Sequence, residues 1–293
     1  RRVLFRSLNA QMLRWFNHWL KGIDTGIMNE PEVAVFDAAT KVWRYENEYP
    51  LKRTQWTKFY FHTQAGAPAT QPPYGALSQT PPAQETPDSY KMPDSYAQLT
   101  QNKPVVAYST APLESDLRVW GPISIILYAA SSQPDTVFFV KLFDVAPDGK
   151  PEFLSKGILK ASFREVDAAK SKPGQPFHPF NKQELIEPGK IYEYQIEISP
   201  IARTFLKGHC VQVQIASEDH TYTNPLRTLD LHLLPWPVEN TIHHDAGHPS
   251  HILLPVIPDA PEIAEVKAPL KDIDWPAPTG MWLPRTDGWP LKA

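Results

Sequence analysis

Two apolar runs between residues 121 and 165 constrain the fold of this chain more than any other feature of its sequence. In the first run, Ile123, Ile125 and Leu127 recur at every second position, which is the period of a strand with one buried face. The second run, Val137–Val145, is followed by the turn sequence Pro-Asp-Gly and then by a third strand-like segment. The stretch therefore predicts a β-meander.

Proline is the residue type whose abundance is unusual. The 293 residues include 32 prolines and 13 glycines, a composition typical of strands and loops that predicts few helices. The net charge of -3 predicts no nucleic-acid partner, and no apolar run approaches the ~18 residues of a membrane-spanning helix. The single cysteine, Cys210, excludes a disulfide within the chain and leaves the cellular compartment undetermined.

The N-terminal part predicts one amphipathic helix over residues 8–22, ended by Gly22. Its apolar side chains recur three and four positions apart and are Met12, Trp15, Phe16, Trp19 and Leu20. They need a large partner surface, because burying each is worth about 1.5–3 kcal/mol. We interpret residues 1–7 as a non-native segment, since one reading frame of a common sequencing adapter encodes the same heptapeptide.

Short alternating segments predict further strands at residues 33–36, 57–62, 105–110, 191–198 and 211–216. Residues 63–104 are rich in Pro, Gln, Thr, Ser and Ala, so we expect a long surface loop there rather than a part of the core. This loop contains Pro-Asp-Ser-Tyr twice, at residues 87–90 and 93–96, which predicts a duplicated turn. A second Pro-rich surface loop is expected over residues 170–184.

Several segments together resemble the C-terminal jelly-roll domain of the X-Pro dipeptidyl peptidase and cocaine esterase family of serine hydrolases. The longest is SSxxDTxFxxKLxDVxPDG at residues 131–149. The others include LRWFxHWLKGxDxGIMxEP at residues 13–31, WRxExEYPL at 43–51, LIxPGxIYE at 185–193 and HPSHILLPVI at 248–257. The chain departs from the family pattern at Tyr49, where a tryptophan is usual, and at Cys210, where an arginine is usual.

The resemblance implies a mostly β, galactose-binding-like jelly-roll sandwich over residues 30–257, which includes the loop at 63–104. Residues 8–29 resemble the last helix of an α/β-hydrolase domain and its exit into the sandwich. The apolar helix face is therefore expected to pack against a missing N-terminal catalytic domain. Residues 258–293 predict an extended, Pro-rich strap laid over apolar surface, with three tryptophans spaced by sevens, Trp275, Trp282 and Trp289.

The nucleophile of such hydrolases lies in a G-x-S-x-G turn, and no serine of this chain occupies that pattern. The resemblance places the serine, aspartate and histidine of the triad upstream of the first helix. We therefore expect no catalytic residue here and no activity of the chain alone, although the parent protein is expected to hydrolyse acyl esters or X-Pro dipeptides. Cys210 and His209 are not expected to form a nucleophile pair, because neighbours on a strand point to opposite faces.

Histidines gather near the C-terminal end of the predicted sandwich, at His232, His243, His244, His248 and His251. Their spacing matches neither H-E-x-x-H nor a Cys/His zinc pattern, so we predict structural histidines and no metal or other cofactor. No calcium site is expected either, because the candidate aspartates are scattered over separate hairpins and loops: Asp135, Asp144, Asp148 and Asp219.

In relatives, the jelly roll leans on the catalytic domain and helps to wall its cleft. By that resemblance, four residues at a strand end and in the next loop are predicted to contact the acyl side of a substrate: Tyr128, Ser131, Ser132 and Asp135. The expected partners are the catalytic domain and, in a homo-oligomer, further copies of the protein. The alternative is a free-standing sandwich that binds carbohydrate or another ligand, and such a module has no use for an apolar face on its first helix.

Overall fold

The computed structural model describes residues 2–63, 75–92, 105–218 and 237–258. Within them there are two compact units, a smaller one made of residues 2–34 and 45–49 and a larger one made of residues 35–44 and 50–258. The predicted strap lies outside the described residues, apart from Pro258. Among the described residues, no helix combines the length and the apolar character needed to cross a lipid bilayer.

The smaller unit is built on α1 (Arg2–Lys21), which is followed by the short 3-10 helix η1 (Ile27–Asn29). Gly22 ends α1 with a φ of 67°, and its amide donates to His18 O, as at many helix C-termini. The predicted helix is thus confirmed, but it begins at Arg2 and includes residues that we interpreted as non-native. Arg14 is buried and pairs with Glu30 at 2.6 Å, which ties α1 to the segment after it.

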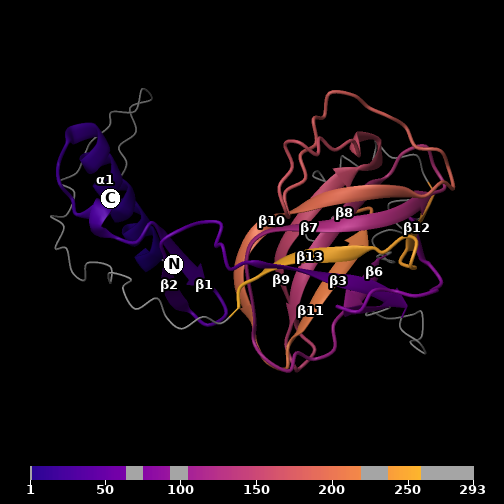
Figure 1. Ribbon diagram of the computed structural model, residues 1–293, viewed down its shortest axis with the longest axis horizontal. Helices are drawn as coiled ribbons and strands as arrows, with labels where there is room; N and C mark the ends of the chain where they lie inside the picture. The colour runs from indigo at the N-terminus through magenta and orange to yellow at the C-terminus, as the bar shows by residue number, and fades with distance from the viewer. Residues whose placement is uncertain (1, 64–74, 93–104, 219–236, 259–293) are drawn as a thin grey trace, which may run out of the picture. The chain divides into compact units, whose positions relative to one another are not determined.

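Two strands, β1 (Val33–Asp37) and β2 (Val42–Glu46), form a small sheet of their own. Eleven further strands form the larger unit (Figure 1). They are β3 (Gln55–Thr63), β4 (Gly75–Ser78), β5 (Asp88–Met92), β6 (Val106–Ser109), β7 (Leu117–Ser131), β8 (Val137–Val145), β9 (Pro151–Lys160), β10 (Tyr192–Phe205), β11 (Cys210–Ala216), β12 (Val238–His243) and β13 (His251–Val256). A second 3-10 helix, η2 (Ala161–Phe163), follows β9.

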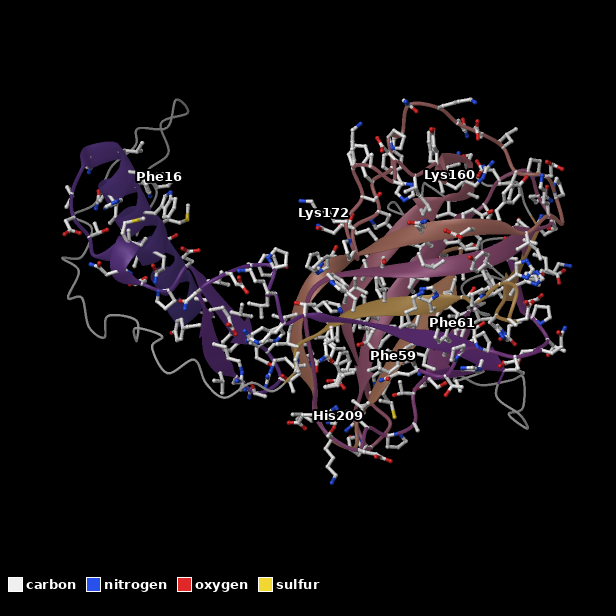
Figure 2. All side chains as sticks on the ribbon, in the orientation of Figure 1. Phe16, Phe59, Phe61, Lys160, Lys172 and His209 are labelled. Carbon is white, nitrogen blue, oxygen red and sulfur yellow. The ribbon has the colours of Figure 1, made fainter. Side chains whose placement is uncertain are left out.

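The strands pair in the order β5-β12-β7-β13-β3-β4-β6-β11-β8-β9, and β10 pairs with β7. This path folds over into two layers. Phe138 on β8 packs against Tyr194 of β10 at 4.9 Å, although β8 lies near one end of the path and β10 is joined to it through β7. Phe61 on β3 stacks on Tyr108 of β6 at 4.3 Å, across the strand β4 that pairs with both. Phe59 and Phe61, both labelled in Figure 2, contribute to the single large core that fills the space between the layers. The predicted all-β sandwich is confirmed.

The predicted meander is wrong in its first step. β8 and β9 form the expected hairpin, but β7 pairs with β10, β12 and β13 and not with β8. The five residues between β7 and β8 instead carry the chain from one layer to the other. The error arises because the alternation of apolar residues shows that a strand has a buried face but not which strand lies beside it.

The predicted loop at residues 63–104 is also wrong in part, since it contains β4 and β5. Their alternate residues Leu77, Tyr90 and Met92 are buried in the core. The first Pro-Asp-Ser-Tyr copy forms β5 rather than a turn, because pairing with β12 fixes it as an extended strand. The second copy lies outside the described residues, and β12 itself was not predicted.

A buried ionic network links β8, β9 and β10 with the turn before β11. Arg203 donates to Asp144 Oδ2 from Nε at 3.0 Å and from Nη2 at 2.6 Å, and also to both oxygens of Glu152. His209 Nδ1 lies 2.7 Å from the other oxygen of Asp144, at the end of the sandwich marked in Figure 2. Because Asp144 is almost fully buried, its charge depends on these partners.

Candidate functional site

The outer face of the sandwich carries a group of polar side chains near the end of β7. Tyr128 of β7 lies opposite Glu193 of β10 on one side and opposite His243 of β12 on the other. Directly opposed residues of antiparallel strands point to the same side of a sheet. The flanking residues Leu127 and Ala129 are fully buried in the core, so these three side chains share the solvent side.

The Tyr128 hydroxyl donates a 2.8 Å hydrogen bond to Glu193 Oε2. Partial burial, together with this hydrogen bond, raises the pKa of Tyr128 to about 12. The phenol is therefore neutral and a hydrogen-bond donor at physiological pH, and it does not act as a base. Its ring also meets His248 edge to face, with centroids 5.6 Å apart.

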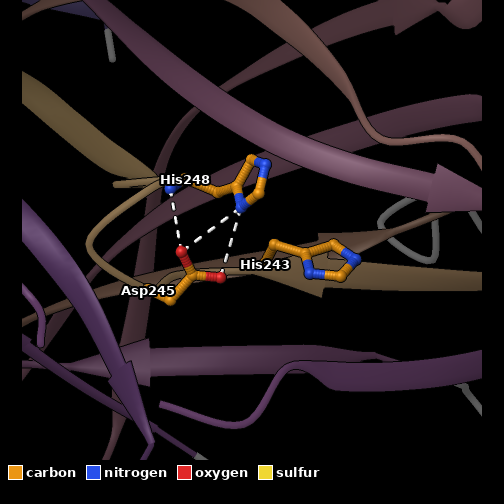
Figure 3. A group of neighbouring side chains, drawn as sticks. All are labelled: His243, Asp245 and His248. Atoms are coloured by element: carbon orange, nitrogen blue, oxygen red, sulfur yellow. Dashed lines mark hydrogen bonds and ion pairs between the residues drawn. The ribbon is translucent and has the colours of Figure 1, made fainter. Parts of the chain in front are cut away.

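Asp245 and His248 lie in the turn between β12 and β13, beside His243, as Figure 3 shows. Asp245 Oδ1 accepts the amides of Gly247 at 2.7 Å and His248 at 3.1 Å, and Oδ2 lies 3.2 Å from His248 Nδ1. Burial on its own raises the pKa of Asp245, but the hydrogen bonds from His248 and Gly247 outweigh it and lower that pKa. Burial and the neighbouring His248 lower the pKa of His243.

His244, the first residue after β12, is buried and points into the sandwich. Its Nε2 lies 2.9 Å from Asp88 Oδ2, and the same carboxylate oxygen accepts the Tyr108 hydroxyl at 2.9 Å. Glu85 lies between His62 Nδ1, at 2.7 Å, and His244 Nδ1, at 3.5 Å. The side chain of His244 is fully enclosed, so this inner network holds strands together rather than presenting groups to a ligand.

The other three predicted cleft residues, Ser131, Ser132 and Asp135, make hydrogen bonds within the sandwich. Asp135 is buried and accepts hydrogen bonds from the Thr136 amide and from the amide and hydroxyl of Ser162, and it pairs with Lys160 at 3.1 Å. Ser132 exchanges hydrogen bonds with the backbone of Glu239. Ser131 is buried, unlike the partly exposed Tyr128. Of the four residues, the partly exposed Tyr128 and the exposed Ser132 therefore have side chains that reach the solvent.

Several other sequence candidates also have structural partners. The His209 imidazole is bound to Asp144, and partial burial raises the pKa of the Cys210 thiol, so the pair shows no sign of an activated nucleophile. His251 Nδ1 lies 2.7 Å from Pro249 O. Asp148 occupies its turn and accepts the Lys150 amide. His232 and Asp219 lie outside the described residues.

The five predicted packing residues of α1 are exposed. Met12, Trp15, Phe16, Trp19 and Leu20 are between 48% and 77% exposed. The Trp15 and Trp19 rings lie 5.7 Å apart and are in contact. Phe16, on the same helix, is labelled in Figure 2. Large exposed aromatic patches of this kind are typical of surfaces that bind another protein or domain.

Comparison with known families identifies the sandwich. Residues 25–253 match the family described as the X-Pro dipeptidyl-peptidase C-terminal non-catalytic domain. The chain belongs to this family. The resemblance found in the sequence motifs is thereby confirmed, and the matched residues include β1 to β12 and the first half of β13.

Relatives of this C-terminal domain are longer proteins. The chain is 29% identical to a cocaine esterase from Rhodococcus over 83% of its own length and 45% of the relative's. It is 24% identical to a putative Xaa-Pro dipeptidyl-peptidase from Bacillus anthracis, over 72% of its own length and 33% of the relative's. The chain thus spans less than half of the length of these relatives.

The fold of the C-terminal domain is shared with a crystal structure of a CocE/NonD family hydrolase from Staphylococcus aureus. The TM-score is 0.70, over 86% of this chain and 46% of that chain. The sequence identity is 15%, so the likeness shows the fold alone.

Proposed function

We propose that this chain is the C-terminal, non-catalytic part of a serine hydrolase that acts on acyl esters or X-Pro dipeptides. It stabilises a catalytic α/β-hydrolase domain through α1 and contributes Tyr128 to the wall of the substrate cleft. The observation that carries the proposal is the family match over residues 25–253, in a chain without a G-x-S-x-G serine. The chain alone is expected to hydrolyse no ester, because the nucleophile and its base belong to the catalytic domain.

The exposed face of α1 supports the first part of the proposal. A catalytic domain that covers this face would remove five large apolar side chains from water, whereas a free-standing ligand-binding module would leave them exposed. Tryptophan and phenylalanine are also the side chains that contribute most to interfaces. The proposed occupant of the face is the catalytic domain of the same protein.

The double substitution Trp15→Glu and Trp19→Lys tests whether the catalytic domain covers this face of α1. The isolated 293-residue chain is expected to self-associate through the bare face, and the double variant is expected to be monomeric in sedimentation velocity. Its unfolding midpoint should match that of the unmodified chain, because both indoles are already half exposed.

Leu185→Glu is a matched control, since Leu185 is 62% exposed and lies in the larger unit. It should leave self-association unchanged. In the intact hydrolase, the α1 double variant is expected to lower the unfolding midpoint. Two results together would contradict docking through α1. The isolated chain would be monomeric at high concentration, and the double substitution would leave the unfolding midpoint of the intact protein unchanged.

The position of Tyr128 supports the second part of the proposal, because its hydroxyl and ring lie on the solvent side at the end of β7. In the intact hydrolase, Tyr128→Phe is expected to change the ratio of kcat/KM values for short and bulky acyl esters by about tenfold, since the ring loses the hydrogen bond to Glu193 that fixes its position in the wall of the cleft. Tyr60→Phe on β3 is the control and should leave the ratio unchanged. If Tyr128→Phe and Tyr60→Phe give the same ratio of kcat/KM values, Tyr128 does not line the cleft.

A further inference from the structure

The turn between β12 and β13 brings together three side chains that can bind a metal ion. His243, Asp245 and His248 each offer one ligand atom, and these atoms all lie within 4.8 Å of one another. The three residues form the spacing H-x-D-x-x-H, which is not one of the usual zinc patterns. From this geometry we infer that His243, Asp245 and His248 form a site for a divalent transition-metal ion such as Zn²⁺.

The distances are close to those of a metal site. Asp245 Oδ2 and His248 Nδ1 are 3.2 Å apart, and neighbouring ligand atoms around a tetrahedral Zn²⁺ lie ~3.3 Å apart when each bond is ~2.0–2.1 Å. The ligand atom of His243 lies within 4.8 Å of the other two, so side-chain movements of about 1.5 Å or less bring the third ligand to the same spacing. Three protein ligands leave a fourth position for water or another small ligand.

The turn holds these ligands on a fixed backbone. The Ala246 amide donates to Ala83 O at 2.8 Å, which anchors the turn to the segment before β5. The buried Ser250 hydroxyl donates to His243 O at 2.6 Å and accepts the Tyr128 amide at 2.9 Å. Ligands that are held before the ion arrives lose less conformational freedom on binding.

The Asp245 carboxylate is also oriented in advance. The amides of Gly247 and His248 both donate to Oδ1, and the two carboxylate oxygens lie 3.3 Å (Oδ1) and 3.2 Å (Oδ2) from His248 Nδ1. This arrangement supplies the outer hydrogen bonds that commonly orient carboxylate ligands of metals. His243 and Asp245 are partly exposed, and the His248 side chain is 35% exposed, so an ion can reach the site from solvent.

The ligand types select the class of ion. Two imidazoles and one carboxylate suit zinc and its neighbours in the first transition row, whereas magnesium and calcium prefer sites made of oxygen ligands alone. Zn²⁺ is therefore expected to bind and Mg²⁺ is not.

Isothermal titration calorimetry tests the site directly. A tag-free 293-residue chain, stripped with EDTA and dialysed, is titrated with ZnCl₂ and separately with MgCl₂. We expect one Zn²⁺ per chain, a dissociation constant on the order of 1 μM or lower, a higher unfolding midpoint in zinc, and no response to Mg²⁺. His243→Gln and His248→Gln should each weaken zinc binding at least about tenfold.

His243→Gln is the most informative variant, because none of the turn's hydrogen bonds given above uses the His243 side chain. His18→Gln on α1 is the matched control, which also removes one imidazole and should leave the affinity for zinc unchanged. Unfolding midpoints of the metal-free variants show whether the turn is intact. The proposed site is wrong if the chain does not bind zinc. It is also wrong if His243→Gln, His18→Gln and the unmodified chain bind zinc with equal affinity.

Discussion

Replacing Arg203 with methionine is expected to lower the free energy of unfolding by about 3–5 kcal/mol. The substitution keeps most of the volume of the side chain but removes every donor that the guanidinium gives to Asp144 and Glu152. Asp144 is 1% exposed, so its charge remains buried with His209 as its one remaining partner in the network. Urea unfolding followed by tryptophan fluorescence measures the loss.

Lys190→Met is the matched control for the loss of a cation. Lys190 pairs with Glu187, but both side chains are more than half exposed, so solvent screens the pair and its loss should leave the stability nearly unchanged. Adding Asp144→Asn to Arg203→Met removes the uncompensated charge and should recover part of the stability. A loss below about 1 kcal/mol for Arg203→Met would show that the network contributes no more than a surface pair.

Gly157→Ala is expected to destabilise the sandwich by about 2–3 kcal/mol. β9 and β10 approach each other closely at this glycine, and Ser155 donates to Ser199 O at 2.7 Å nearby. A Cβ at position 157 would lie 2.0 Å from Glu197 O and 3.2 Å from Ile196 Cγ2. Because the first neighbour is backbone, one strand must move away from the other and disturb the core beneath.

Ile158→Ala separates this steric effect from a general effect on β9. Ile158 is the next residue of the strand and is 52% exposed, so its truncation should cost below about 1 kcal/mol. Thermal and urea unfolding of the two variants are compared side by side. If Gly157→Ala is as stable as the unmodified chain, the strands do not approach each other as closely as described.

Local periodicity predicts the first helix and many of the strands, but not β4, β5 or β12 and not how the strands are ordered. The alternation around Ile125 and the helical spacing of Trp15 and Trp19 both correspond to observed elements. The order of the strands depends on pairing between residues far apart in the chain, such as Ile252 with Ile125. β4 and β5 were missed because they are four and five residues long, and tertiary pairing overrides the turn propensity of Pro-Asp-Ser.

The candidate site was predictable only in part. Tyr128 could be placed at a strand end from the pattern, but the enclosure of Asp135 depends on Ser162 and Lys160, which are distant in sequence. The sequence shows the clustering of the histidines, whereas nothing in it marks Asp245 as their neighbour. The spacing from His243 to His248 becomes informative only when a turn reverses the chain between them.

The coding sequence upstream of the codon for Leu8 tests the central claim most directly. We predict one continuous reading frame in which a G-x-S-x-G turn is followed by an aspartate and a histidine before Leu8. Such a sequence would join this C-terminal domain to its catalytic domain, and the whole protein would then be assayed on acyl esters and X-Pro peptides. A start codon or a signal peptide immediately upstream would contradict a C-terminal place in a serine hydrolase and favour a free-standing ligand-binding sandwich.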